Sequence, residues 1–324
     1  MITSKKRRRL LQAGASLSLA PWVGVLKAQD KYPSKPIRVI LGLPPGGVVD
    51  NSMRALAAVL QPRLGQTLII DNKPGGTFAI AMQALSMAPA DGYTLLHITT
   101  TALTGQAVQK RFDVFKQLQP IALLGSSDIA YAVGAKSPHK TMQDLINWGK
   151  ANPRKLSYGT PGIGSIEHLG VSAFCRKVGI EAVHIPFKGS PDVMQATATG
   201  EIDFGTMAVP FIAQFGPKGL VRSLMVAAHK RNPILPDVPS MDDLKLDTPR
   251  MNTWGGLAAP TGTPKSVIDY LETQILESMK SPELLKQYAS MGLAATPQGA
   301  TAFGKEWAED WAWISKAAQE TQLD

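Results

Sequence analysis

Short apolar runs alternate with amphipathic, helix-like segments along most of this chain, and that alternation limits the folds available to it. The first apolar run covers residues 37–41, a Pro-Pro-Gly-Gly turn follows at 44–47, and a helical pattern extends from about Asp50 to Leu64. Further strand-like runs fall at 68–70, 93–98, 121–124, 130–133, 156–159, 182–185, 202–206 and 223–227. Strands that alternate with helices are typical of a parallel α/β architecture.

Hydroxyl residues followed by proline predict where four helices begin, because a hydroxyl can cap a helix and proline is favoured at its first position. The pairs are Ser190-Pro191, Thr263-Pro264, Ser281-Pro282 and Thr296-Pro297. Thr141 and Asp144 have the spacing of a capping box. The segment from Thr263 onward is mostly helical in pattern, and Trp307 and Trp311 share one helical face, which predicts a packing stripe.

Length and composition predict two domains with ordinary hydrophobic cores. The chain has 324 residues, of which 44% are hydrophobic and 18% charged. Domains average roughly 150 residues, so two are expected. The single cysteine, Cys175, excludes a disulfide framework and any metal site built from several thiolates.

The N-terminus has the pattern of an export signal. Residues 1–28 contain six basic side chains and no acidic one, and an apolar stretch ends near the small residue Ala28. These features are typical of a cleavable secretory signal, and Arg7-Arg8-Arg9 also resembles a twin-arginine signal. The alternative is a basic amphipathic or membrane-anchoring segment. We expect residues 1–28 to be a signal peptide and the protein to be periplasmic.

Much of the positive charge lies in that N-terminal segment. The chain carries 34 Lys and Arg against 25 Asp and Glu, a formal net charge of +9. Residues 29–324 retain 28 basic and 25 acidic side chains, a net charge of +3. They contain no basic run with interleaved aromatic residues, so the sequence predicts no nucleic-acid partner.

Sequence motifs of the common enzyme and metal-site classes are missing. The chain contains no G-x-S-x-G, no G-x-x-x-x-G-K-[ST] and no H-E-x-x-H. Gly162 and Gly164 begin a G-x-G pattern, but Glu167 occupies the place of the third glycine of a dinucleotide site. The five histidines are scattered at 97, 139, 168, 184 and 229. We therefore expect no catalytic residue, no metal and no cofactor.

Turns rich in glycine and hydroxyl residues follow the strand-like runs and predict a binding cleft. They are Pro44-Pro45-Gly46-Gly47, Gly75-Gly76-Thr77, Thr99-Thr100-Thr101, Gly125-Ser126-Ser127 and Thr160-Pro161-Gly162-Ile163-Gly164-Ser165. Ligands of open α/β sheets bind at the carboxyl ends of strands, where helix N-termini attract anions. Residues 42–53, 97–109, 125–135 and 159–175 contain no Lys or Arg, so N–H groups, hydroxyls and water must hold a carboxylate there. The alternative is that these are ordinary turns, which favour the same residues.

Seven short stretches between residues 32 and 264 match one protein family in order and spacing. They are 32–38, 44–47 with Asp50, 71–75, 90–96, 184–190, 235–240 and 257–264. In these stretches the chain resembles the periplasmic substrate-binding receptors of tripartite tricarboxylate transporters, the Bug or TctC-like family. The resemblance implies a type II-like periplasmic binding fold, with two α/β lobes and a ligand cleft between them. It implies lobe 1 at residues 29–124 and 255–324, lobe 2 at 125–254, and crossover strands near 119–127 and 251–259.

The same resemblance implies which residues bind the ligand. It places a ligand carboxylate, with bridging waters, on the loop formed by Pro45, Gly46, Gly47 and Val48. The rest of the implied pocket consists of Thr99, Thr100, Thr101, Ser126, Ser127, Thr160, Gly162, Gly164, Ser165 and His168. Asp50 is interpreted as a helix cap or, alternatively, as a ligand contact. His168 either donates to a second carboxylate or braces its own loop.

Three departures from the family pattern bear on the ligand. Val48-Val49 replaces Gly-Thr after the Pro-Pro-Gly-Gly turn, Phe78 falls in a turn that is usually glycine-rich, and Met207 stands where many members have Asp. Without that acidic partner for an ammonium group, an amino acid is not the expected ligand. We expect a small carboxylate or dicarboxylate with an aromatic or otherwise apolar body that packs on Val48, Val49, Phe78 and Met207.

Three functions are compatible with these features. The first is a monomeric extracytoplasmic receptor that captures a small organic carboxylate and delivers it to membrane permease subunits. The second is a periplasmic component that presents its ligand to a signalling receptor. The third is an enzyme on the same bilobal fold, and the missing nucleophile–base pair argues against it.

Overall fold

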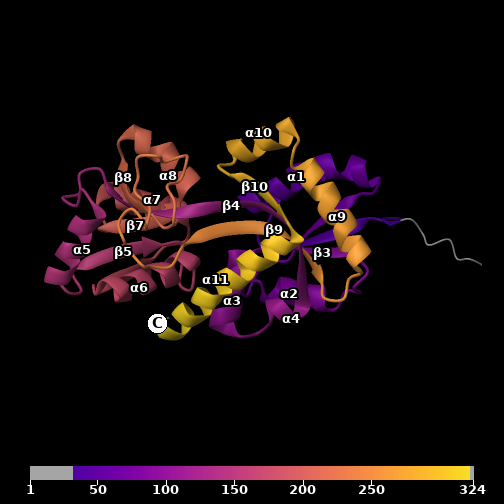
Figure 1. The fold of residues 1–324 in the computed structure, drawn as a ribbon, viewed down its shortest axis with the longest axis horizontal. Coiled ribbons are helices and arrows are strands. Elements are labelled where there is room, and N and C mark those ends of the chain that lie inside the picture. The colour runs from indigo at the N-terminus through magenta and orange to yellow at the C-terminus, as the bar shows by residue number, and fades with distance from the viewer. Residues whose placement is uncertain (1–31, 322–324) are drawn as a thin grey trace, which may run out of the picture.

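Two β-sheets, each flanked by helices, form two lobes that are joined by long strands (Figure 1). The fold is described from a computed structural model that covers residues 32–321. The segment 1–28, predicted to be an export signal, lies outside the described residues. Within residues 32–321, no helix is both long and apolar enough to cross a bilayer.

The first sheet has the strand order β2-β1-β3-β9-β4-β10. Its strands are β1 (Ile37–Leu41), β2 (Leu68–Asn72), β3 (Thr94–Thr99), β4 (Leu118–Gly134), β9 (Asn252–Pro260) and β10 (Ala295–Gly299). β1 pairs in parallel with β2 and β3, whereas β9 runs antiparallel to both β3 and β4. The apolar sequence of β1 is almost wholly buried, as expected for a strand covered on both faces.

The second sheet has the order β8-β4-β7-β5-β6, so β4 belongs to both sheets. The added strands are β5 (Leu156–Thr160), β6 (Ala182–Pro186), β7 (Phe204–Ala208) and β8 (Val221–Val226). The first part of β4 pairs with β9 as far as Asp128, and the rest pairs with β7 and β8. β4 and β9 therefore cross from one lobe to the other.

Helices cover both faces of each sheet (Figure 1). Those of the first lobe are α1 (Val48–Leu64), α2 (Ala79–Ser86), α3 (Thr100–Gln109), α4 (Val114–Gln117), α9 (Lys265–Ser278), α10 (Pro282–Ser290) and α11 (Ala300–Glu320). Those of the second are α5 (Met142–Ala151), α6 (Ile166–Val178), α7 (Ser190–Thr199) and α8 (Val209–Phe215). In Figure 1, the long helix α11 runs diagonally from the first lobe toward α6 of the second.

Successive residues of a strand pack into hydrophobic cores on opposite faces of the sheet. Val39 packs with α1 and α9 on one face of the first sheet, whereas its neighbour Ile40 packs with α2, α3 and α11 on the other. Trp307 of α11 is buried there, with its ring stacked 6.1 Å from that of Trp254. The tryptophan stripe thus packs in the core at Trp307, as its helical spacing predicts.

The structure corrects several predicted boundaries. The runs 121–124 and 130–133 belong to one continuous strand, because the polar segment between them stays extended against β9. Thr296 and Pro297 lie in β10, and α11 begins only at Ala300. Thr263 donates its hydroxyl to the Pro260 carbonyl and does not cap α9.

The helix start predicted at Ser190-Pro191 is confirmed, although the N-cap of α7 is Gly189 and not Ser190. Two of the predicted capping interactions are confirmed as well. The Ser281 hydroxyl accepts a hydrogen bond from the Leu284 N–H at the start of α10. Thr141 and Asp144 form the complete capping box at the start of α5. Both signals lie within a single turn of chain, so distant residues do not alter them.

Candidate functional site

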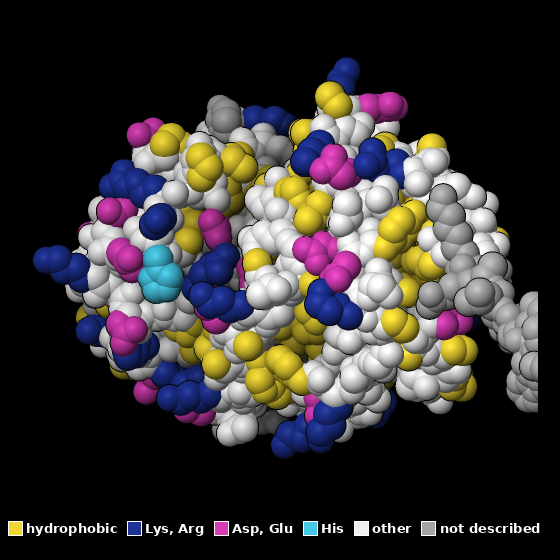
Figure 2. All heavy atoms as spheres, turned by 45° about the vertical axis from the view of Figure 1, so that its right-hand side comes forward, with side chains coloured by type: hydrophobic (Ala, Val, Ile, Leu, Met, Phe, Trp, Pro, Cys, Tyr) yellow, Lys and Arg dark blue, Asp and Glu magenta, His cyan; other side chains and the backbone are white. Residues whose placement is uncertain are grey.

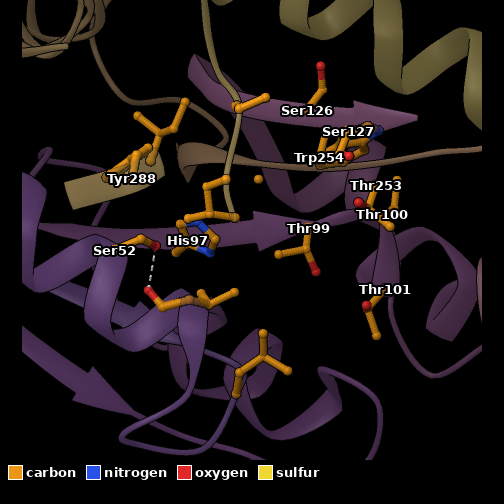
Figure 3. Close-up of a pocket in the computed structure, with 17 residues that line it drawn as sticks. Ser52, His97, Thr99, Thr100, Thr101, Ser126, Ser127, Thr253, Trp254 and Tyr288 are labelled. Atoms are coloured by element: carbon orange, nitrogen blue, oxygen red, sulfur yellow. Dashed lines mark hydrogen bonds between the residues drawn. The ribbon is translucent and has the colours of Figure 1, made fainter. Parts of the chain in front are cut away.

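A cavity of about 230 Å³ lies beside the crossover strands, between the N-terminal end of α1 and the turn that joins β3 to α3 (Figure 3). In the space-filling view the surface is hollowed between the two lobes, and hydrophobic side chains lie in the hollow (Figure 2). The lining residues are Leu43, Val49, Ser52, His97, Thr99, Thr100, Thr101, Leu124, Gly125, Ser126, Ser127, Thr253, Trp254, Gly255, Tyr288, Leu293 and Ala294. None of these described residues is Lys, Arg, Asp or Glu.

The cavity brings together six of the residues predicted to bind ligand. They are Val49, Thr99, Thr100, Thr101, Ser126 and Ser127. Thr99 ends β3, and the next two threonines begin α3. All three therefore lie at the connection between a strand and the N-terminus of a helix. The first N–H groups of α3 have no partner within the helix, as at every helix start. Hydroxyls and free N–H groups therefore gather at this end of the cavity.

Three residues that line the cavity each carry a polar atom that is enclosed by protein and has no partner in residues 32–321: His97 Nδ1, Thr99 Oγ1 and the Tyr288 hydroxyl. Tyr288 faces Ser52, but their hydroxyls form no hydrogen bond of ordinary geometry, and the Ser52 hydroxyl instead donates to the Val49 carbonyl. An unpaired buried polar group costs about 1–3 kcal/mol. A ligand or water in the cavity reaches these atoms only if the side chains turn toward it.

His97 is neutral at neutral pH, because burial lowers the pKa of its imidazole to about 4. Gly255 on β9 leaves space for this ring: a Cβ at Gly255 would lie 3.0 Å from His97 Cε1 and Nε2. Any larger residue at Gly255 would therefore press on the imidazole and narrow the cavity. The shape of this wall depends on a residue without a side chain.

The loop before α1 is braced from within. The Asp50 carboxylate accepts a hydrogen bond from the Gly46 N–H at 3.0 Å and pairs with Arg54, also at 3.0 Å. The pairing with Arg54 lowers the pKa of Asp50, despite its burial. Asn72 extends the brace, because its side-chain amide donates to the Leu43 carbonyl. The structure thus favours a loop-bracing role for Asp50 over ligand contact.

Pro45, Gly46, Gly47 and Val48 are exposed and lie just outside the residues that line the cavity. Gly46 has a φ of +79°, a left-handed conformation that favours glycine. Gly47 is the N-cap residue of α1, so the N–H groups of the first α1 residues have no partner within the helix. This loop offers N–H groups to an anion at the edge of the cavity.

The predicted residues of the second lobe do not line this cavity. Thr160, Gly162, Gly164 and Ser165 form the turn between β5 and α6. A Cβ at Gly164 would lie 3.4 Å from the Val108 side chain of α3, so this turn stands against the first lobe.

The His168 side chain stabilises the same turn between β5 and α6. Its Nδ1 accepts a hydrogen bond from the Gly164 N–H at 3.1 Å, and its ring stacks on His184 with centroids 3.8 Å apart. Burial lowers the pKa of both imidazoles to about 4. His184 Nε2 lies 2.7 Å from Thr160 Oγ1. Of the two interpretations of His168, the structure shows the bracing one.

Phe78 and Met207 lie inside hydrophobic cores, not on the cavity wall, which corrects the expectation that they contact the ligand. Phe78 is 1% exposed, and its ring fills the space beside Gly42, where a Cβ would lie 2.7 Å from Phe78 Cδ1. Met207 is fully buried with residues of α7 and α8. Val49 lines the cavity, whereas Val48 is about half exposed outside it.

Several cavity residues were not predicted as site residues. His97, Trp254, Gly255 and Tyr288 line the cavity, yet none belongs to a turn motif. His97 lies within an apolar run two residues before Thr99. Because alternate side chains of a strand point to the same face, this spacing predicts that His97 and Thr99 share one face. Tyr288 has no such signal, because it reaches the cavity only through the packing of α10 on α1.

A family model described as the tripartite tricarboxylate transporter family receptor matches residues 52–314. The chain is 32% identical over 288 residues to the UPF0065 protein in the gbd 5′ region of Cupriavidus necator, covering 89% of this chain and 87% of that one. It is similar to a solved TctC solute-binding protein from Polaromonas, with a TM-score of 0.82, 27% identity, and coverage of 90% of this chain and 100% of that one. It is also similar to R. palustris Rpa4515, solved with adipate, with a TM-score of 0.72, 25% identity, and coverage of 89% and 98%.

The family match includes most of the cavity, from Ser52 to Ala294. The two lobes and their curled sheets are those of the periplasmic binding proteins among the similar structures. The chain therefore belongs to the tripartite tricarboxylate transporter family of receptors.

Proposed function

We propose that this protein is a periplasmic receptor that binds a small organic carboxylate between its lobes and delivers it to the membrane subunits of a tripartite tricarboxylate-type transporter. One observation carries the proposal: the N-termini of α1 and α3 meet a cavity lined by hydroxyls and, among the described residues, by no acidic side chain. Helix N-termini and hydroxyls bind anions without a cationic side chain. The adipate in Rpa4515 is a carboxylate of the expected kind.

In this proposal the carboxylate accepts hydrogen bonds from the N–H groups at the start of α1 and from the hydroxyls of Thr99, Thr100 and Thr101. The Gly46 N–H is engaged by Asp50, which leaves the following N–H groups of the loop for the ligand. Ser126 and Ser127 of β4 complete the wall beside the crossover. The proposal includes no catalytic step.

The two lobes are assigned to residues 29–124 with 255–324 and to residues 125–254. The pairing of β4 supports this division. Up to Asp128 β4 pairs with β9 of the first sheet, and beyond it β4 pairs with β7 and β8 of the second sheet. Bending at this point would move the turn of Thr160, Gly162, Gly164 and Ser165, which already lies against α3 of the first lobe, relative to the cavity. The receptor is proposed to act as a monomer. On the face shown in Figure 2, basic and acidic side chains are interspersed, without the basic stripe that a nucleic-acid partner needs.

The test is thermal unfolding of the purified protein in the presence of adipate, malate, benzoate and 4-hydroxybenzoate. A ligand at a hundred times its Kd stabilises the folded state by about 2.7 kcal/mol, which raises Tm by several degrees. Native mass spectrometry of the same sample identifies any carboxylate that co-purifies. If no carboxylate raises Tm and none co-purifies, the proposed function is wrong.

Gly46→Ala tests the site, and Gly65→Ala is its matched control. Both glycines have positive φ and open space around them, but Gly65 lies at the other end of α1. Each substitution costs about 1 kcal/mol of strain. Only Gly46→Ala should weaken carboxylate binding, by about tenfold or more, because it displaces the loop at the cavity. If the two variants bind the carboxylate with equal affinity, this loop does not contribute to the binding site.

A further inference from the structure

We propose that the cavity binds the uncharged end of the ligand, an aromatic ring that bears a hydroxyl group, and excludes a second carboxylate. The inference rests on the proposed function, because it takes the first carboxylate to lie at the threonine end of the cavity. It narrows the ligand class from mono- and dicarboxylates to hydroxylated aromatic monocarboxylates.

The size and walls of the cavity fit a ring. A cavity of 150 Å³ lined by apolar side chains holds benzene, so about 230 Å³ accommodates a substituted ring. Leu43, Val49, Leu124 and Leu293 supply apolar walls, and the Trp254 indole supplies an aromatic one. The indole is held in place, because its N–H donates to Asp310 at 2.6 Å. The apolar part of a ligand can therefore pack on cavity walls of which one, the Trp254 indole, is already held in position.

The far end of the cavity is polar but uncharged. We call Ser52, His97 and Tyr288 the histidine corner; they lie together on the side of the close-up away from Thr100 and Thr101 (Figure 3). His97 Nδ1 and the Tyr288 hydroxyl have no partner among the described residues, and both side chains are less than 5% exposed. A ligand hydroxyl both donates and accepts, so it pairs with these groups, whichever tautomer His97 adopts, once the side chains turn toward the cavity. Its binding removes the cost of leaving them unpaired.

A carboxylate does not suit the histidine corner. Burial keeps His97 neutral, and none of the described lining residues is Lys or Arg. A buried carboxylate without a cation or several donors loses its hydration and gains too little in return. Dicarboxylates of similar size should therefore bind less tightly than hydroxylated monocarboxylates.

Isothermal titration calorimetry with benzoate, 3-hydroxybenzoate, 4-hydroxybenzoate, terephthalate and adipate tests the inference on the whole protein. We expect at least one hydroxybenzoate to bind about tenfold or more tightly than benzoate, and terephthalate and adipate to bind more weakly than that hydroxybenzoate. If either dicarboxylate binds as tightly, the inference is wrong while the proposed function stands. If no carboxylate binds, both are wrong.

Variants locate the hydroxyl. Tyr288→Phe removes one unpaired oxygen and keeps the ring, so the fold should tolerate it, and His97→Leu removes the imidazole. At least one of the two should reduce the preference for hydroxybenzoate over benzoate to about onefold. Tyr270→Phe, on α9 and outside the cavity lining, is the control and should change neither affinity. A preference that survives in both corner variants overturns the inference.

Discussion

The indole N–H of Trp254 donates a hydrogen bond to the Asp310 carboxylate at 2.6 Å, and this bond joins the crossover strand β9 to helix α11. Trp254 also lines the cavity, so the bond connects the cavity wall to α11. At its other end α11 reaches the second lobe, where Glu320 pairs with Arg176 of α6 at 3.2 Å. Burial, with a smaller contribution from nearby Glu306, raises the pKa of Asp310 to about 6.

Asp310→Ala should destabilise the protein by about 1–3 kcal/mol, because it leaves the indole N–H buried without a partner. Circular dichroism during thermal unfolding should show Tm lowered by a few degrees. Glu309→Ala is the control, since its neighbouring carboxylate is exposed and pairs only with Lys305. Equal Tm values for the two variants would show that the Trp254 bond contributes nothing to stability.

His97 should make the folded protein sensitive to acid. The unfolded chain protonates this histidine below about pH 6.5, whereas the folded state resists protonation down to a pKa of about 4. The contribution of His97 to stability is therefore constant above about pH 6.5 and falls as the pH drops toward 4. The loss over this window is at most about 3 kcal/mol.

The measurement is urea unfolding of wild type and His97→Leu at pH 7, 6, 5 and 4. Because the other titrating groups, including Asp310, are shared, the difference between the two proteins isolates His97. Stability of the wild type relative to the variant should decline as the pH falls. The exposed His229→Asn variant serves as control. A difference that is independent of pH contradicts the prediction.

Phe78 combines a strained backbone with a buried ring. Its φ of +75° lies in the left-handed region, which costs a bulky residue roughly 1–2 kcal/mol. Removing the buried ring costs about 3–5 kcal/mol in Phe78→Ala. Phe78→Gly loses the same ring but relieves the strain, so it should be at least as stable as Phe78→Ala.

Denaturant unfolding of the two Phe78 variants provides the comparison. At most positions glycine is less stable than alanine by about 0.5–1 kcal/mol, so the expected order here is reversed. A glycine variant less stable than the alanine variant would mean that Phe78 is not held in the left-handed region.

Thr296→Val should loosen the cavity wall at Ser126. The Thr296 hydroxyl accepts from the Ser126 N–H at 2.8 Å and lies 2.9 Å from the Ser126 hydroxyl. Its loss should cost about 0.5–1.5 kcal/mol of stability and weaken carboxylate binding. Thr273→Val is the control, because its exposed hydroxyl bonds only within α9. Unchanged affinity in Thr296→Val would show that β10 does not support the site.

The sequence predicted those structural elements that are determined by residues adjacent to one another in the chain. The apolar run of β1 and the Thr141–Asp144 capping box are examples, since each depends on a few adjacent residues. The hydroxyls at Thr99 and Ser126 were likewise predicted as part of the site, because they follow strand-like runs.

Pairings between distant segments could not be predicted in the same way. Ser126 and Ser127 have the composition of a turn, yet they remain extended because Trp254 and Thr253 pair with them. Thr296 and Pro297 have the sequence of a helix start, yet β10 pairs with β4. His97 and Gly255 meet only because β3 and β9 are neighbours. No periodicity within either segment contains that information.

The strand order of the first sheet also determines when this sheet can be completed. β3 and β4 do not pair with each other, because β9 lies between them and begins only at Asn252. A growing chain therefore carries β3 with one unpaired edge until more than 150 further residues have been synthesised. Exposed strand edges are prone to pair with other chains. Until β9 has been synthesised, this edge of β3 is therefore the part of the first sheet at which pairing with another chain is possible.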